Sequence, residues 1–286
     1  MIKINKGEKV LEPLVKKEAP FIYFHIPAWE KLDQNLKVGF SSRHGGTSAY
    51  PFQTMNLALH VGDNQETVID NRKTLSHELG FSFDAWTAAD QVHGNHIAIV
   101  NMEDKGKGSK DLQTAIQAAD GMVTNEKGIL LTSYYADCTP LLFFDPVKKV
   151  IGLAHAGWKG TVLKIGAKMI ETMVKEFGSN VNNILVTIGP AIDQCCYEVN
   201  DQVINPLKKS LSFIPLEMIV DKKNGHFDLN LKKANEQILI EAGILPNNIE
   251  ISSYCTSCDN DLFFSYRREK GSTGRMASWI GFRKDE

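Results

Sequence analysis

A chain of 286 residues with 43% hydrophobic and 23% charged residues can bury a large core, which excludes an intrinsically disordered protein. A formal net charge of −2 argues against bulk electrostatic binding to nucleic acid or to a membrane surface, and no apolar run reaches the length of a membrane span. Residues 1–7 lack the apolar core of a signal peptide, so we expect a cytoplasmic protein whose five cysteines are reduced thiols or ligands.

Apolar residues at helical spacing predict three helices, each followed by a glycine that can end it. The first follows Asp63 or Asn64, either of which can cap it. The second carries its apolar face over residues 162–177, directly after the motif at 155–160. The third runs over residues 231–242 with Asn230 before it as a cap, and the glycines that end the three helices are Gly80, Gly178 and Gly243.

Runs of apolar residues predict strands between these helices. Residues 103–117 are charged and rich in glycine, which is typical of a solvated loop and makes them the best candidate for disorder. The tail at 263–282 has the pattern of a strand, a basic turn and a second strand. The other predicted strands lie at 21–24, 38–40, 97–100, 128–132, 184–188 and 249–252.

Two apolar runs flank an Asp-Pro turn at 145–146 and predict a β-hairpin. If the turn is centred between Pro146 and Val147, Cys138 lies directly opposite His155. Directly opposed residues have Cβ atoms about 4.5–5.5 Å apart on one face of the sheet. A thiolate and an imidazole so placed can share a zinc ion or act as a nucleophile and its base. A slip of one residue would put them on opposite faces.

Several cationic and imidazole side chains are further candidates. Arg43 stands beside two glycines and offers a planar fork for an anion, although a surface arginine at a turn is the commoner explanation. Lys159 and the free N–H groups at the start of the second helix suit a phosphate. His93 and His96 diverge if Gly94 makes a turn, so one of them is expected to be functional. A local cationic patch fits a small anion better than a polymer, and it contains Arg267, Arg268 and Arg275.

The remaining four cysteines form two pairs, of which Cys255 and Cys258 are interpreted as structural. Cys255 and Cys258 have Cys-x-x-Cys spacing, but a structural zinc needs two more ligands and the chain has no second pair with that spacing. The adjacent Cys195 and Cys196 are candidates for metal binding, and core thiols are at least as plausible.

Taken together, these motifs resemble the YfiH/YlmD family, whose members are also described as multicopper polyphenol oxidases or laccase-domain proteins. The resemblance implies a single compact α+β domain over residues 1–286, with mixed β-sheets flanked by helices, distantly like cysteine-dependent deamidase toxins. It covers nearly the whole chain and depends on six motifs in order, at 42–46, 56–63, 91–94, 136–138, 155–160 and 264–268.

The family resemblance implies a purine nucleoside phosphorylase. Its partners would be phosphate and the nucleosides adenosine, inosine or methylthioadenosine, and it would also deaminate adenosine. The resemblance places both the metal ligands and the catalytic residues at His93, Cys138 and His155, with zinc as the metal and copper possible at the same site. Substrate contacts are expected at Arg43, Asn56, Gln91, Lys159 and Arg275.

The chain's own chemistry argues against a four-copper oxidase, because it has only eight histidines and no His-x-His pair. Two alternatives stay open. In one, Cys138 is a nucleophile and His155 its base, which would make a hydrolase or amidase linked to editing of cell-wall precursors. In the other, the protein is a non-catalytic metal-binding partner of other proteins. The oligomeric state, monomer or homodimer, is also left open, and neither nucleic acid nor membrane is expected as a partner.

Overall fold

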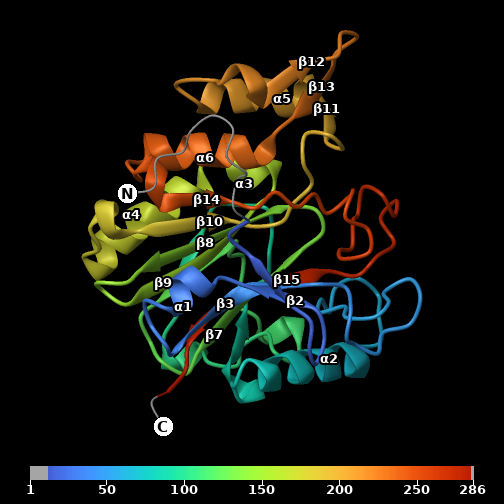
Figure 1. The fold of residues 1–286 in the computed structure, drawn as a ribbon, viewed down its shortest axis with the longest axis vertical. Helices are drawn as coiled ribbons and strands as arrows, with labels where there is room; N and C mark the ends of the chain where they lie inside the picture. The colour runs from blue at the N-terminus through green and yellow to red at the C-terminus, as the bar shows by residue number, and fades with distance from the viewer. Residues whose placement is uncertain (1–11, 285–286) are drawn as a thin grey trace.

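Two six-stranded sheets lie at the centre of the structure, which is a computed structural model and describes residues 12–284 (Figure 1). Residues 1–11 and 285–286 lie outside this description. Two predictions therefore concern residues outside the description: the lack of an apolar signal-peptide core in residues 1–7, and the two ends of the domain predicted over residues 1–286.

The first sheet is antiparallel except for one parallel pair at its edge. β4 pairs in parallel with β7, and every other neighbouring pair is antiparallel. In spatial order its strands are β1 (Val15–Lys17), β2 (Tyr23–His25), β3 (Leu36–Ser41), β15 (Met276–Phe282), β7 (Leu130–Tyr135) and β4 (Trp86–Ala88).

The second sheet contains the predicted hairpin at its centre and has a parallel pair at each edge. In spatial order its strands are β14 (Ile249–Ile251), β10 (Leu185–Ile188), β8 (Thr139–Asp145), β9 (Val150–Ala156), β6 (Gly121–Thr124) and β5 (Ile97–Ile99). A small third sheet follows it in the chain and consists of β11 (Glu198–Asn200), β13 (His226–Leu229) and β12 (Ile219–Asp221).

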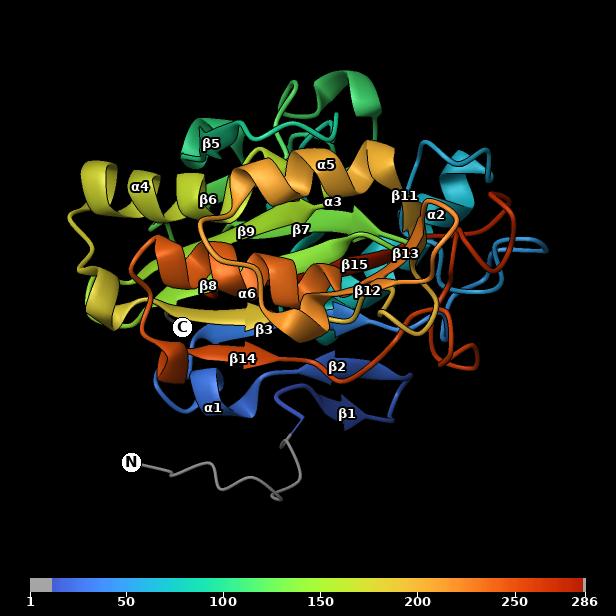
Figure 2. The same ribbon diagram turned by 90° about the horizontal axis from the view of Figure 1, so that it is seen from above.

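Within the described part of the chain, six α-helices surround the sheets: α1 (Pro27–Glu30), α2 (Gln65–Glu78), α3 (Trp158–Val162), α4 (Ile165–Phe177), α5 (Asp201–Ser210) and α6 (Leu231–Glu241). α2 packs on the first sheet through one apolar cluster, while α4 and α6 pack on the second sheet through another (Figure 2). None of the helices within residues 12–284 is long and apolar enough to cross a membrane.

The side chains of β8 alternate between two cores. Leu142 and Phe144 lie between the two large sheets, whereas Leu141 and Phe143 face the helices on the other side. A strand buried on both faces must be apolar at every position, which explains the continuous apolar run in the sequence. The predicted α+β architecture, with mixed sheets flanked by helices, is therefore confirmed.

The predicted first and third helices are confirmed together with their caps. The side chain of Asn64 accepts a hydrogen bond from Thr67 N at the start of α2, and Asn230 accepts one from Lys233 N at the start of α6. The glycines after these helices have positive φ, as helix-ending residues commonly do: 74° at Gly80 and 98° at Gly243.

Other expectations about the elements were wrong, wholly or in part. The second helix is broken into α3 and α4, because Lys164 adopts a left-handed conformation with φ 58° between them. Residues 263–265 have no regular secondary structure and 266–268 form a turn, so the predicted strand is absent there. Residues 103–117 do form a loop that is mostly exposed or half-buried, but it contains short 3₁₀ turns, and the buried Arg72 side chain holds it by donating to the carbonyls of Gly108 and Ser109 at 2.7 and 2.8 Å.

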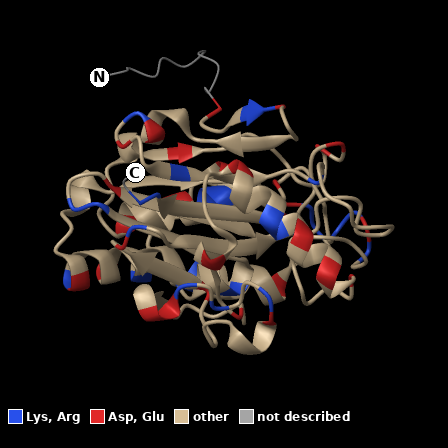
Figure 3. Cartoon of the chain, turned by 90° about the horizontal axis from the view of Figure 1, so that it is seen from below, with Lys and Arg blue, Asp and Glu red and all other residues tan. Residues whose placement is uncertain are grey.

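Charged positions of both signs are interspersed over the face of the molecule seen in Figure 3, and most of the strands there carry none. The one-sided basic field of a protein that binds nucleic acid through bulk charge does not appear in this view.

Candidate metal centre and adjoining cavity

The β8–β9 hairpin brings Cys138 and His155 together, but in a register that differs from the predicted one. Pro140 pairs with His155, so Cys138 lies just before the strand rather than opposite His155. The loop is two residues longer than predicted, since Asp145 Oδ1 accepts hydrogen bonds from the backbone of the loop and Lys149 takes φ 55° at its end. Cys138 and His155 are nevertheless neighbours, because the segment that leads into β8 places the thiol beside the imidazole ring.

His93, Cys138 and His155 form one cluster. Their candidate ligand atoms all lie within 4.8 Å of one another, and the two imidazole rings meet edge to face at 78°. Two imidazoles and one thiol match the donor set of a catalytic zinc site that keeps a fourth position open. His93 is exposed while His155 is only 3% exposed, so the cluster lies between the core and solvent. The arrangement is compatible with metal binding.

Asp120, at the start of β6, organises this cluster. Its buried carboxylate accepts a 2.8 Å hydrogen bond from Nδ1 of His155, which leaves Nε2 of that ring for a ligand. It also accepts backbone N–H bonds from Val92, His93 and Gly94 at 3.2, 3.0 and 2.6 Å. A carboxylate behind a ligating histidine is the usual way in which proteins fix the tautomer and orientation of the ring.

Gly157 leaves the space that the cluster needs. A Cβ atom at this position would lie 2.8 Å from Cys138 Sγ and 3.2 Å from Cδ2 of His93. Any larger residue would therefore displace a candidate ligand. The glycine two residues after His155 thus has a steric reason.

The electrostatics of the cluster favour a thiolate. Burial alone raises the pKa of the Cys138 thiol, but attraction to His155 and hydrogen bonds from His155 and His93 outweigh it and lower the pKa to about 6. Burial lowers the pKa of His155, and the nearby Cys138 and Asp120 reverse this and raise it to about 9. The protein therefore holds the sulfur in the form that binds metals and attacks electrophiles.

A cavity of 620 Å³ opens beside the cluster and has the size of a small-molecule site. All three cluster residues line it, as do Gln91 and Arg275. Its walls also carry four aromatic side chains from distant parts of the chain, namely Tyr134, Trp158, Tyr197 and Tyr266.

Gln91 and Arg275 lie in the cavity wall through well-defined contacts. The side-chain amide of Gln91 donates to Tyr134 O at 3.0 Å and accepts from Tyr134 N at 2.9 Å. The Arg275 guanidinium lies 5.5 Å from the centre of the Tyr266 ring and donates through Nη1 to Thr273 O and Gly274 O.

The other three expected substrate contacts are not among the lining residues. The Arg43 guanidinium pairs with Glu269 at 3.0 Å and lies over the Phe264 ring. Asn56 is fully buried and accepts a bond from Arg275 N at 3.0 Å, so it supports the wall from behind. Lys159 is exposed on α3, which is only five residues long and so lacks the extended helix start expected to suit a phosphate.

Sequence reasoning missed Asp120 and the aromatic wall. The one available signal for Asp120 was its position directly before a buried strand that leads toward the cluster. Asp137 and Cys138 are adjacent in sequence, yet both line the cavity. The reason is that β8 begins only at Thr139, so strand alternation does not apply to the two residues before it.

Comparison with known proteins agrees with this geometry. A family model described as multi-copper polyphenol oxidoreductase laccase matches residues 37–283. The chain belongs to this family. It is 39% identical over 262 residues to a Bacillus subtilis protein named purine nucleoside phosphorylase YlmD, covering 91% of this chain and 94% of that one. It is 41% identical over 250 residues to the Geobacillus stearothermophilus protein of the same name, covering 86% and 90%.

Solved structures show the same fold. The crystal structure of YlmD from Geobacillus stearothermophilus matches with a TM-score of 0.91 at 37% identity, covering 96% of this chain and all of that chain. The Bacillus licheniformis hypothetical protein YfiH matches with a TM-score of 0.89 at 39% identity, covering 94% and 99%. The family expected from the sequence motifs is therefore confirmed.

Proposed function

We propose that the protein is a purine nucleoside phosphorylase, which uses phosphate to convert a purine nucleoside into the free base and ribose 1-phosphate. The observation that carries this proposal is that the His93–Cys138–His155 cluster opens onto an aromatic cavity that also contains Arg275. Two relatives at about 40% identity are named for this activity. We propose adenosine, inosine and methylthioadenosine as substrates.

The aromatic wall suits a purine base. Flat π faces stack on nucleobases without demanding a particular one, which agrees with a range of purine substrates. Burial raises the pKa of Tyr197, so its phenol stays protonated at neutral pH and can donate a hydrogen bond to a ring nitrogen. This donor would help the departing base to carry the electron pair of its broken bond.

Arg275 is the best-placed candidate for holding phosphate. Its main chain is held by Asn56 and its Nη1 by two carbonyls, while Nε and Nη2 have no hydrogen-bond partner among the described residues. A guanidinium edge presents two parallel donors that match phosphate oxygens. In the reaction a phosphate oxygen forms a bond to ribose C1′, the C1′–N9 bond breaks, and its electron pair leaves with the purine.

His93, Cys138 and His155 are proposed as the ligands of one zinc ion, and copper can occupy the same donors. When bound, the metal would supply a Lewis acid beside the substrate. Asp120 holds His155 in the tautomer whose Nε2 can ligate. We also propose the weaker adenosine deamination expected of the family, in which water replaces the amine at purine C6 without phosphate.

A second candidate function has its own observation. Cys138, His155 and Asp120 are arranged as a nucleophile, a base and a carboxylate that orients the base. In the absence of metal this set suits a cysteine hydrolase or amidase. The two functions differ in their response to metal: a zinc-bound thiolate is protected from alkylation, whereas a nucleophilic one reacts quickly.

The test is product analysis after incubation of the purified protein with adenosine, inosine or methylthioadenosine, with and without phosphate. We expect phosphate-dependent release of free base, and loss of this release when Cys138 or His155 is replaced by alanine. Slow formation of inosine from adenosine without phosphate would reveal the deaminase activity. If no nucleoside is cleaved at any phosphate concentration, the proposal fails. Activity on amides that survives removal of metal would favour the hydrolase.

A further inference from the structure

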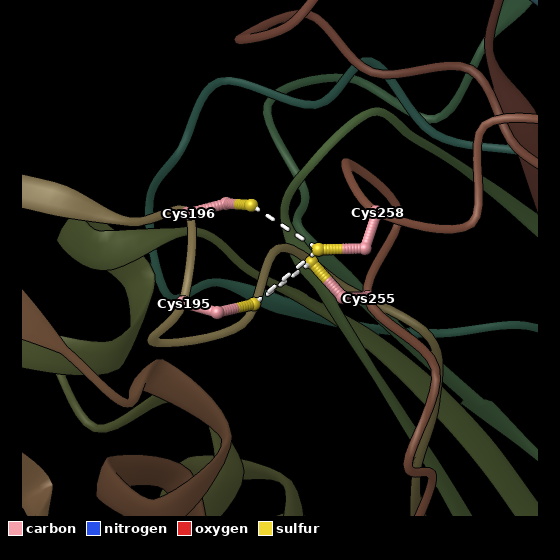
Figure 4. A group of neighbouring side chains, drawn as sticks. All are labelled: Cys195, Cys196, Cys255 and Cys258. Atoms are coloured by element: carbon pink, nitrogen blue, oxygen red, sulfur yellow. Dashed lines mark hydrogen bonds between the residues drawn. The ribbon is translucent and has the colours of Figure 1, made fainter.

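Two pairs of cysteines that are distant from each other in sequence meet at one point outside the cavity (Figure 4). Cys195 and Cys196 lie on the segment after β10, and Cys255 and Cys258 on the segment after β14. β10 and β14 are parallel neighbours, with Ile188 beside Ile251, so their C-terminal ends emerge at the same edge of the sheet. The topology therefore brings a vicinal pair and a Cys-x-x-Cys pair together.

The four sulfur atoms have the spacing of a single ion's coordination shell. Cys195 Sγ lies 3.7 Å from Cys255 Sγ and 3.5 Å from Cys258 Sγ, and Cys196 Sγ lies 3.4 Å from Cys258 Sγ. All four lie within 4.8 Å of one another. Zinc–sulfur bonds of about 2.3 Å in a tetrahedron place the sulfurs about 3.8 Å apart. An iron–sulfur cluster would hold its cysteines farther apart, because irons and sulfides would lie between them.

From this geometry we propose a second metal site, in which Cys195, Cys196, Cys255 and Cys258 bind one zinc ion as a structural tetrathiolate. Four thiolates select a soft or borderline metal, and zinc is the one that is commonly held in closed Cys₄ sites. The site is separate from the proposed catalytic cluster, which takes its one sulfur from Cys138.

Hydrogen bonds hold the backbone around the cysteines in place. Thr256 N donates to Ala191 O at 3.1 Å, and Ala191 and Cys255 form an isolated bridge that ties the two segments together. Asp193 N–H points at Cys255 Sγ at 3.3 Å, as amide groups do around metal thiolates. The Arg268 guanidinium donates to the carbonyls of Thr256 and Ser257 inside the Cys-x-x-Cys loop, at 2.7 and 2.9 Å.

Ordinary core packing does not explain this cluster. Free cysteines are usually buried as small apolar side chains. Here only Cys255 is buried, whereas Cys195 and Cys258 are exposed and Cys196 is intermediate. Three thiols at the surface gain little from packing, and their exposure gives an ion a path into the site. A structural zinc site does not need a second Cys-x-x-Cys pair here, because a vicinal pair supplies the other two ligands.

The site would fix one wall of the cavity. Tyr197 follows Cys196 directly and lines the cavity, as does Ile192 on the same segment. On the other segment, the Thr256 hydroxyl donates to Asp137 Oδ1 at 2.6 Å, next to the candidate ligand Cys138. An ion that joins the two segments would hold both contacts in place.

The experiment uses the full chain carrying Cys138→Ser, purified without chelator under reducing conditions. This change removes the thiol of the catalytic cluster and leaves all four proposed ligands intact. We expect about one equivalent of zinc per chain by elemental analysis. X-ray absorption should show four sulfur neighbours at about 2.3 Å and no nitrogen. After exchange into cobalt, the charge-transfer bands should have the intensity of a tetrathiolate.

A second pair of variants assigns that metal. Cys195→Ser/Cys258→Ser in the Cys138→Ser background should lose the zinc, whereas Ser257→Ala, which changes the same loop at a non-ligand, should retain it. The inference is overturned if the Cys138→Ser chain holds no zinc, if its metal has nitrogen neighbours, or if intact-mass measurement finds the four cysteines joined in two disulfides. None of these outcomes depends on whether the protein cleaves nucleosides.

Discussion

Replacing Asp120 by asparagine tests whether one buried carboxylate holds the catalytic cluster together. Oδ1 accepts bonds from His93 N and His155 Nδ1, while Oδ2 accepts bonds from Val92 N and Gly94 N. An asparagine amide has one NH₂ group, which must point toward one of these two pairs of donors. In either orientation, two charge-assisted hydrogen bonds are lost and donors meet donors.

The size of the effect follows from these contacts. A hydrogen bond to a charged group contributes about 1.5–3 kcal/mol, so losing two of them should lower the free energy of unfolding by about 3–6 kcal/mol. If the His155 ring changes tautomer to accept from the amide, its Nε2 becomes protonated and cannot ligate. The metal affinity of the cluster should then fall by about 10–100-fold, as for other outer-shell partners.

The assay is a competition titration of zinc against a chromophoric chelator, together with chemical denaturation of the metal-free chain. Asp90→Asn is the matched control, because it removes the same charge from the same cavity. Within residues 12–284 the Asp90 side chain makes no hydrogen bond to the cluster. If the Asp120→Asn variant keeps the zinc affinity and the stability of the unaltered chain, the role given to this carboxylate is refuted.

Three other perturbations test the site. Gly157→Ala places a Cβ 2.8 Å from Cys138 Sγ and should lower the zinc affinity by about 10–100-fold. Gly94→Ala should leave the zinc affinity unchanged, because its Cβ would meet only contacts of 3.5 Å or more. Equal affinities of the two variants in a chelator competition would argue against the steric role of Gly157. In the zinc-free chain, alkylation of Cys138 should accelerate as pH rises through about 6, because the pKa of its thiol is lowered to that value. The rate is followed by peptide mass spectrometry, and a midpoint of the rate near the ordinary thiol pKa of about 8.5 would contradict this. Arg275→Lys should raise the KM for phosphate by about tenfold, the equivalent of one charge-assisted hydrogen bond. Arg43→Lys should leave this KM unchanged, because Arg43 pairs with Glu269. If steady-state kinetics show a raised KM for Arg43→Lys and an unchanged one for Arg275→Lys, Arg43 rather than Arg275 holds the phosphate.

Local signals in the sequence predicted the elements well where chemistry and pattern agreed. Asn64 and Asn230 cap helices as expected, and the apolar run of β8 forms a strand buried on both faces. The break at Lys164 was not predictable, because a left-handed lysine has no signal in the pattern of apolar residues. The hairpin register failed for a similar reason: the four-residue loop depends on the Asp145 side chain and on a left-handed Lys149.

The candidate site was predictable only in part. The motifs pointed to His93, Cys138 and His155, and the structure gathers these three residues. Asp120 and the aromatic wall depend on which strand ends meet at one end of the molecule, and neither periodicity nor spacing contains that information. The same limit hid the four-cysteine cluster, whose two pairs are about sixty residues apart in sequence and meet only because β10 and β14 are parallel neighbours.

The two clusters of candidate metal ligands are connected through Asp137. Its carbonyl accepts a bond from Ile192 N at 3.1 Å, and its carboxylate accepts bonds from Thr256 Oγ1 and Arg267 N at 2.6 and 2.9 Å. Both cysteine-bearing segments therefore contact the residue that precedes Cys138. If the proposed ion changes the metal affinity at Cys138 through these contacts, thermodynamic linkage requires the effect to be equal in both directions. The two cysteine-bearing segments are thus hydrogen-bonded to the cavity wall at Asp137, although none of the four cysteines lines the cavity.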